Sequence, residues 1–126
     1  MRWLTIALLV LTLGAVWAKD YVDITIGGKF IMRLRTGVGD LTREERAQIL
    51  EERLVKLLGE RLTADQITLK EVRKDQQYEI HIRGQLFVTV TPADAEAAKM
   101  SVKQLAEHWL KQLRANLPPL SARPPA

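Results

Sequence analysis

The sequence contains no cysteine. This absence excludes disulfide bonds, thiolate metal sites, a cysteine nucleophile and the lipidated cysteine of a bacterial lipoprotein. Serine is nearly as scarce, because Ser101 and Ser121 are the only two in the chain. A serine nucleophile with a histidine base would need a serine beside a histidine, and neither position offers one.

Glycine-rich phosphate loops are also missing. Gly27 and Gly28 precede a predicted strand rather than a helix, and the segment from Gly37 to Gly39 lacks the lysine and the serine or threonine of such a loop. Carboxylate pairs on the predicted helix of residues 42–59 have arginines beside them, so we expect them to stay ionised and to serve solubility. We therefore expect no enzyme and no cofactor.

The first eighteen residues differ from the rest of the chain. Met1 and Arg2 form a short positive start, the run from Trp3 to Ala18 carries no charge, and Val16 to Ala18 suits signal peptidase. We expect a signal peptide over 1–18 that is cleaved after Ala18, and a periplasmic or secreted bacterial protein. The alternative is an inner-membrane anchor through residues 3–18, although a full span needs about 20 apolar residues.

Two amphipathic helices are predicted. Thr42 and Glu45 form a capping box, and Gly59 is expected to end that helix in a left-handed conformation. Ser101 and Gln104 repeat the box before a second helix that ends by residue 117, ahead of the prolines. The apolar stripes of the two helices comprise Ala47, Leu50, Leu54, Leu57 and Leu58 in the first and Val102, Leu105, Ala106, Trp109 and Leu113 in the second.

Alternating residues predict a hairpin around Gly27 and Gly28, with strands at 21–26 and 29–35. On its second strand the alternation directs Phe30, Met32 and Leu34 inward, and Lys29, Ile31, Arg33 and Arg35 outward. Three further strands, at 67–72, 78–82 and 86–91, form a meander. Thr91, Asp94 and Glu96 could hold a cation or cap a helical turn in the alanine-rich segment 93–100, and we favour capping.

The element order is ββαβββα, which predicts an α+β fold in which two helices pack on one face of an antiparallel sheet. The other sheet face is then left in water. We expect a single α+β domain over residues 19–117 and a disordered proline-rich tail over 118–126.

The open sheet face is the candidate binding site. Its predicted partner-binding residues are Lys29, Arg33, Arg35, Lys70, His81 and Arg83, with Tyr21, Ile31 and Phe87 between them and only Asp23 and Glu79 as acids. Such a face would attract an anionic envelope component, such as a wall polymer or lipid head groups, or an acidic protein. An ordinary solvated face is the alternative. Single-stranded nucleic acid would also suit this mixture, but export argues against it.

Metal binding has one weak candidate. Glu79 and His81 lie two apart on one strand and could share an ion, but no third ligand is nearby in the sequence. We favour a solvated His81. His108 is expected to be a boundary side chain beside a buried Trp109. No metal site is therefore predicted.

Three segments together resemble a known family: ERAQILEERL (residues 45–54), FVTVTPADA (87–95) and LAEHWLKQLRANL (105–117). The chain resembles the extracytoplasmic N-terminal domain that precedes the membrane-spanning part of bacterial, especially cyanobacterial, small-conductance mechanosensitive channel family proteins, from about Val22 to Leu117. The resemblance implies an envelope-facing α+β module without an established catalytic residue. Because the sequence ends at Ala126 without pore helices, we expect no channel activity. The module would act alone or dock onto a membrane protein such as a channel.

Overall fold

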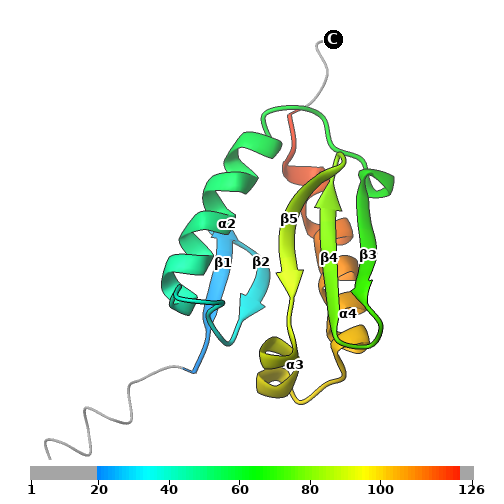
Figure 1. Ribbon diagram of the computed structural model, residues 1–126. Helices are drawn as coiled ribbons and strands as arrows, with labels where there is room; N and C mark the ends of the chain where they lie inside the picture. Colours follow the sequence, from blue (N-terminus) through cyan, green and yellow to red (C-terminus); the bar gives the residue numbers. More distant parts are fainter. Residues whose placement is uncertain (1–19, 123–126) are drawn as a thin grey trace, which may run out of the picture.

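The computed structural model describes residues 20–122, so the expected signal peptide lies outside the described residues. Figure 1 shows two antiparallel sheets with helices around them. The α-helices are α2 (Arg43–Leu57), α3 (Pro92–Ala98) and α4 (Val102–Asn116), and the strands are β1 (Val22–Ile26), β2 (Lys29–Leu34), β3 (Ile67–Arg73), β4 (Gln77–Ile82) and β5 (Gln85–Val90). Two short 3-10 helices, η1 (Ala64–Gln66) and η2 (Pro118–Leu120), complete the chain. The α+β class is confirmed.

Local sequence signals determine the start of each α-helix. The Thr42 hydroxyl accepts from the Glu45 amide at 3.1 Å, and the Glu45 carboxylate accepts from the Thr42 amide at 3.0 Å. The same two bonds join Ser101 and Gln104 before α4. All five residues of the predicted α4 stripe are buried, as are Ala47, Leu50, Leu54 and Leu58 of the first helix. Both helix predictions are confirmed.

The end of α2 differs from the prediction. Leu58 closes the helix with φ −80°, in the right-handed region, and Gly59 is absent from the glycines with positive φ. The guanidinium of Arg83 instead donates to the carbonyl oxygens of Leu57, Glu60 and Arg61, at 2.8 to 2.9 Å. At a left-handed glycine cap, backbone amides just beyond the helix bond its last carbonyl groups. Here Arg83, from the turn after β4, donates hydrogen bonds at the end of α2.

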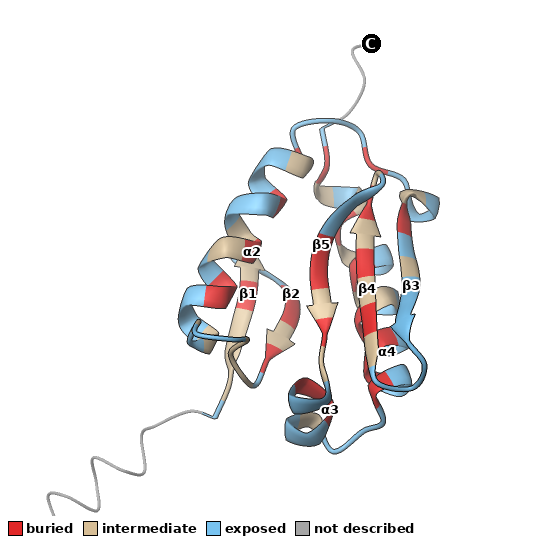
Figure 2. Cartoon of the chain, in the orientation of Figure 1, coloured by how far each residue is buried: buried red, intermediate tan, exposed pale blue. Residues whose placement is uncertain are grey.

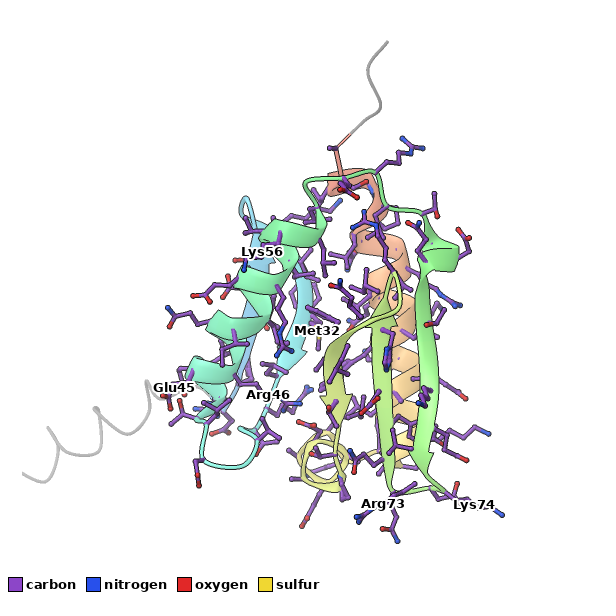
Figure 3. The ribbon with its side chains drawn as sticks, turned by 45° about the horizontal axis from the view of Figure 1, so that its top comes forward. Met32, Glu45, Arg46, Lys56, Arg73 and Lys74 are labelled. Atoms are coloured by element: carbon purple, nitrogen blue, oxygen red, sulfur yellow. The ribbon has the colours of Figure 1, made fainter. Side chains whose placement is uncertain are left out.

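The expected single sheet is divided in two. β1 pairs with β2, and β3, β4 and β5 form a separate meander. Figures 1 and 3 show β2 and β5 as neighbours that do not pair. The helix α2 lies in front and contacts mainly β1, whereas α4 lies behind the meander and contacts mainly β2, β3 and β4; both helices also touch β5 (Figure 1). The two helices therefore do not pack together on one face of one sheet.

A β-bulge near the start of β2 and of β5 interrupts the predicted alternation. Ile24 pairs with Met32 and Thr25 with Phe30, which leaves Ile31 as the extra residue. In the meander, Ile80 pairs with Val88 and His81 with Leu86, which leaves Phe87 as the extra one. Ile31 and Phe87 were expected to face outward, but both are 0% exposed, whereas Phe30 is 38% exposed. After each bulge the predicted alternation holds, since Met32 and Leu34 of β2 and Val88 and Val90 of β5 are buried.

One face of the meander remains uncovered, as predicted. Tyr78, Ile80 and Ile82 of β4 are buried, and Glu79 and His81 between them point away from that core. Figure 2 shows buried positions along β4 and β5 and mainly exposed ones along β3. Within residues 20–122, no helix has the length and apolar character needed to cross a membrane.

The tail prediction is wrong for residues 118–122. Pro118–Leu120 forms η2, since proline has the backbone φ that a 3-10 turn needs. Ser121 is buried, its hydroxyl accepts from the Leu62 amide at 3.0 Å, and the Ala122 amide donates to the Leu58 carbonyl at 2.9 Å. These bonds fasten the chain beyond α4 to the end of α2. Residues 123–126 lie outside the described part.

Alkaline pH should weaken the fold through Tyr78. Its hydroxyl donates to a Glu71 carboxylate oxygen at 2.6 Å, and this bond, with burial, raises the pKa of Tyr78 to about 12. An unfolded tyrosine has a pKa of about 10, so this stabilisation is full below that pH and is lost as pH rises to about 12. We expect urea unfolding at pH 9 to 12 to show this loss in the wild type and less of it in Tyr78→Phe. An unchanged pH slope in that variant would contradict the assignment, and Tyr21→Phe is the matched control.

Candidate functional site

The six predicted binding residues do not gather on one face. Lys29, Arg33 and Arg35 belong to β2 or follow it directly, in the two-stranded sheet. Lys70 and His81 lie on the meander, and Arg83 lies in the turn after β4. The prediction of a single basic face is therefore wrong. The six residues lie in three separate places, and the charged neighbours differ from one place to the next.

On the open face of the meander, an acid balances the bases. His81 Nε2 lies 2.9 Å from Glu79 Oε1, and Lys70 is the cross-strand partner of Glu79. Neighbouring opposite charges favour one another and reduce the field that a distant anion would meet. Among residues 20–122, no cluster of three His, Cys, Asp or Glu side chains could hold a metal ion. This face is a mixed, solvated surface.

Two of the predicted arginines have structural partners. Arg83 donates to the three carbonyl oxygens at the end of α2 described above. Arg33 forms a two-point ion pair with Asp23, with Nε to Oδ1 at 2.7 Å and Nη2 to Oδ2 at 3.3 Å. Its guanidinium also lies 3.7 Å from the ring centroid of Tyr21. The bond to Asp23 raises the pKa of Arg33 above its usual value, so Arg33 stays protonated. The negative charge of Asp23 offsets most of its positive charge.

Arg35 is different, because it is exposed and has no hydrogen-bond or ion-pair partner within residues 20–122. It lines a small cleft of about 130 Å³ between β2 and α4, which we name the β2–α4 cleft. The lining residues are Phe30, Arg33, Arg35, His108, Trp109 and Gln112. No acid is among them, although Asp23 pairs with Arg33 nearby. This cleft brings together two of the six predicted residues.

A hydrogen bond between α4 and β2 fixes the two walls of the cleft relative to each other. The Asn116 side-chain amide donates to the Ile31 carbonyl at 3.0 Å, which ties α4 to β2 at the bulge. The bulge leaves Phe30 exposed at the rim, and the buried Trp109 forms the floor beside the exposed His108. The expectation of a buried Trp109 is confirmed, whereas His108, expected at the boundary, is exposed. Sequence analysis did not connect His108 or Gln112 with the arginines, because only the packing of α4 on β2 joins them.

The lining of the cleft is rich in hydrogen-bond donors, which an anion could accept from. Arginine and glutamine side chains supply N–H donors, and the histidine ring can supply one or two more. A cavity of this size accommodates one carboxylate or phosphate group rather than a whole sugar or nucleotide. Nothing in its lining is a nucleophile of the serine, cysteine or threonine type.

Arg46 and Asp94 form a buried ion pair that the sequence did not predict. Arg46 was expected only to lie beside the ionised carboxylates of the first helix, but it is 4% exposed and Asp94 2%. Two guanidinium nitrogens of Arg46 contact the two Asp94 oxygens, at 2.6 and 3.1 Å, and they also donate to the carbonyls of Thr36 and Thr89. Asp94 also belongs to the capping box of α3, whose N-cap is Thr91, and its carboxylate accepts from the Thr91 amide and hydroxyl. The predicted capping role is confirmed, and Glu96 is exposed.

A comparison with models of protein families shows the family to which the chain belongs. The model described as Domain of unknown function (DUF8459) matches residues 23–118. The chain belongs to this family. The matched range of the DUF8459 domain includes both walls of the β2–α4 cleft and the Arg46–Asp94 pair. No curated protein and no solved structure matches the chain. The resemblance to mechanosensitive channel domains stays a prediction.

Proposed function

We propose that this protein is an exported, non-enzymatic binding module of the bacterial envelope. It binds a carboxylate or phosphate group of an anionic envelope component in the β2–α4 cleft. The observation that carries this proposal is Arg35, which is exposed and unpaired among the described residues in a cleft lined by other nitrogen donors and no acid. The uncharged run after Arg2 supports export.

The working position of the site moves from the open sheet face to this cleft. On the open face, Glu79 lies against His81 and opposite Lys70. At the cleft, Arg35 and His108 have no such neutralising neighbour in the lining. Because an anion gains most where cationic donors converge without competing acids, the cleft is the more favourable place.

Arg35→Glu should weaken binding of the full chain to isolated envelope polymer about tenfold or more, because repulsion replaces attraction at the only unpaired arginine of the cleft lining. The melting temperature should stay nearly unchanged, since Arg35 is exposed and forms no hydrogen bond or ion pair within the described chain. Binding is measured by co-sedimentation at two salt concentrations, and it should weaken at the higher one. Substituting Arg33 as well would confuse the result, because a second acid would then face Asp23.

Lys70→Glu is the matched control, because it makes the same charge change at an exposed position of the open face. We expect it to bind as the wild type does. Equal binding by Arg35→Glu and the wild type would refute the cleft as the site. Loss of binding only in Lys70→Glu would return the site to the open face.

A second candidate is a structural accessory that docks onto a membrane protein such as a channel. It is supported by β3, which pairs only with β4 and leaves its outer edge without a strand partner in residues 20–122. Val72 is the extra residue of a bulge on this strand and is exposed. An open edge can accept a strand from a partner, and proline blocks such pairing. Envelope binding that survives Arg35→Glu but is lost in Val72→Pro would favour this candidate.

A further inference from the structure

A second hollow runs between α2 and β5, separate from the β2–α4 cleft. It consists of an apolar part of about 170 Å³ and a basic part of about 370 Å³. Arg53 and Leu86 line both parts, so the two hollows adjoin along α2 and β5, and we name them together the α2–β5 groove. The apolar part is lined mainly by Val38, Leu41, Ile49, Leu50 and Val88. No residue lines both this groove and the β2–α4 cleft.

Positive charge predominates in the basic part. Arg53, Lys56 and Arg83 line it together with one acid, Glu60. Arg53 uses one nitrogen to donate to the Phe87 carbonyl at 2.7 Å, which leaves its other donors directed to solvent or ligand. Lys56 has no hydrogen-bond or ion-pair partner within the described chain. Arg83 is bound to backbone carbonyls, which do not cancel its charge.

Leu86 joins the two parts. It is 43% exposed, because the bulge that buries Phe87 turns its neighbour outward. The groove therefore offers a partner two kinds of contact: basic side chains in one part, and an apolar surface that includes Leu86 in the other. Interfaces of this kind often combine an apolar anchor with a charged rim.

We propose that the α2–β5 groove binds an extended acidic peptide segment of a partner protein. An aliphatic side chain of the segment enters the apolar part, and its carboxylates face Arg53 and Lys56. The concave shape favours a peptide over a membrane, because a flat layer of head groups would not follow a groove between a helix and a strand. Recognition is by side chains, since Arg53 and Arg46 already occupy the Phe87 and Thr89 carbonyls along the β5 edge.

Selection of random ten-residue peptides, displayed on phage, against the immobilised full chain tests this proposal. Enriched peptides should carry acidic residues beside an aliphatic one. As synthetic peptides they should bind at least tenfold more weakly to Lys56→Glu and to Leu86→Asp, with unchanged melting temperatures. Lys74→Glu is the matched control and should bind normally, because Lys74 lies in an exposed turn at the far end of the molecule from Lys56 (Figure 3).

The outcomes separate this site from the proposed function. Arg35→Glu should leave peptide binding intact, and Lys56→Glu should leave envelope-polymer binding intact. No enrichment, enriched peptides without acidic residues, or equal binding by Lys56→Glu would overturn the groove proposal. Binding of phosphatidylglycerol vesicles that Lys56→Glu abolishes would assign the groove to a membrane surface and would also overturn it.

Discussion

Replacing Arg46 by methionine should lower the free energy of unfolding by about 3–5 kcal/mol. Methionine fills similar space but leaves the Asp94 carboxylate, 2% exposed, without its cation. The carbonyls of Thr36 and Thr89 lose their guanidinium donor as well. Removing one partner of a buried pair costs far more than the pair itself contributes, because the remaining charge stays desolvated. Urea unfolding of the full chain measures the difference.

Two further variants make the Arg46 result interpretable. Arg43→Met removes a neighbouring arginine of the same helix whose ion pair with Glu44 is partly exposed, at 29% for Arg43 and 62% for Glu44, and it should cost at most about 1 kcal/mol. Adding Asp94→Asn to Arg46→Met removes the stranded charge while keeping an acceptor for the Thr91 cap, so it should recover part of the loss. A cost below about 1 kcal/mol for Arg46→Met alone would contradict the buried pair, since only exposed pairs are worth so little.

The position of Arg46 also explains why the strands form two sheets. Its guanidinium contacts Thr36 just after β2, Thr89 on β5 and Asp94 on α3. Arg53 occupies another carbonyl of β5, that of Phe87. The β5 edge is therefore occupied by side chains of α2 rather than by a neighbouring strand. Such covering of an edge is one way in which proteins prevent unwanted strand pairing.

The sequence was sufficient for the helix starts, the α4 stripe and the hairpin turn, which depend on residues close together in the chain. The capping boxes at Thr42 and Ser101 and the α4 stripe follow from spacings of three and four residues, and all were confirmed. The turn at Gly27 and Gly28 was also confirmed, since both have positive φ. The Gly59 stop was wrong because Arg83, which is distant in sequence, binds the end of α2 instead.

The binding site could be predicted only in part, because charge partners are set by the fold. Arg33 and Arg35 lie together as predicted, but beside α4 rather than on an open sheet face, and Asp23 pairs with the first and not with the second. Strand alternation could not show that His108 and Gln112 of α4 would lie beside them. Nor could it reveal the two bulges, whose extra residues have no distinctive local sequence. The pairing of Arg46 with Asp94 spans 48 positions and has no local signal either.

Phe87→Ala should lower the free energy of unfolding by about 3–5 kcal/mol, the usual range for a buried phenylalanine. Simple alternation predicts an exposed Phe87 and hence a small effect. The bulge instead makes Phe87 an extra residue of β5 that is 0% exposed. Truncation would therefore leave a cavity in the core, where few neighbouring groups can close the space. Urea unfolding again provides the measurement.

The adjacent residue gives the sharpest control. Leu86 is 43% exposed and faces the α2–β5 groove, so Leu86→Ala should cost less than about 1 kcal/mol. The hairpin offers the same comparison in another sheet, with buried Ile31 expected to be costly to truncate and exposed Phe30 expected to be tolerant. If Leu86→Ala lowered the free energy of unfolding more than Phe87→Ala does, β5 would follow simple alternation and would lack the bulge. The groove would then lose the apolar residue that joins its two parts.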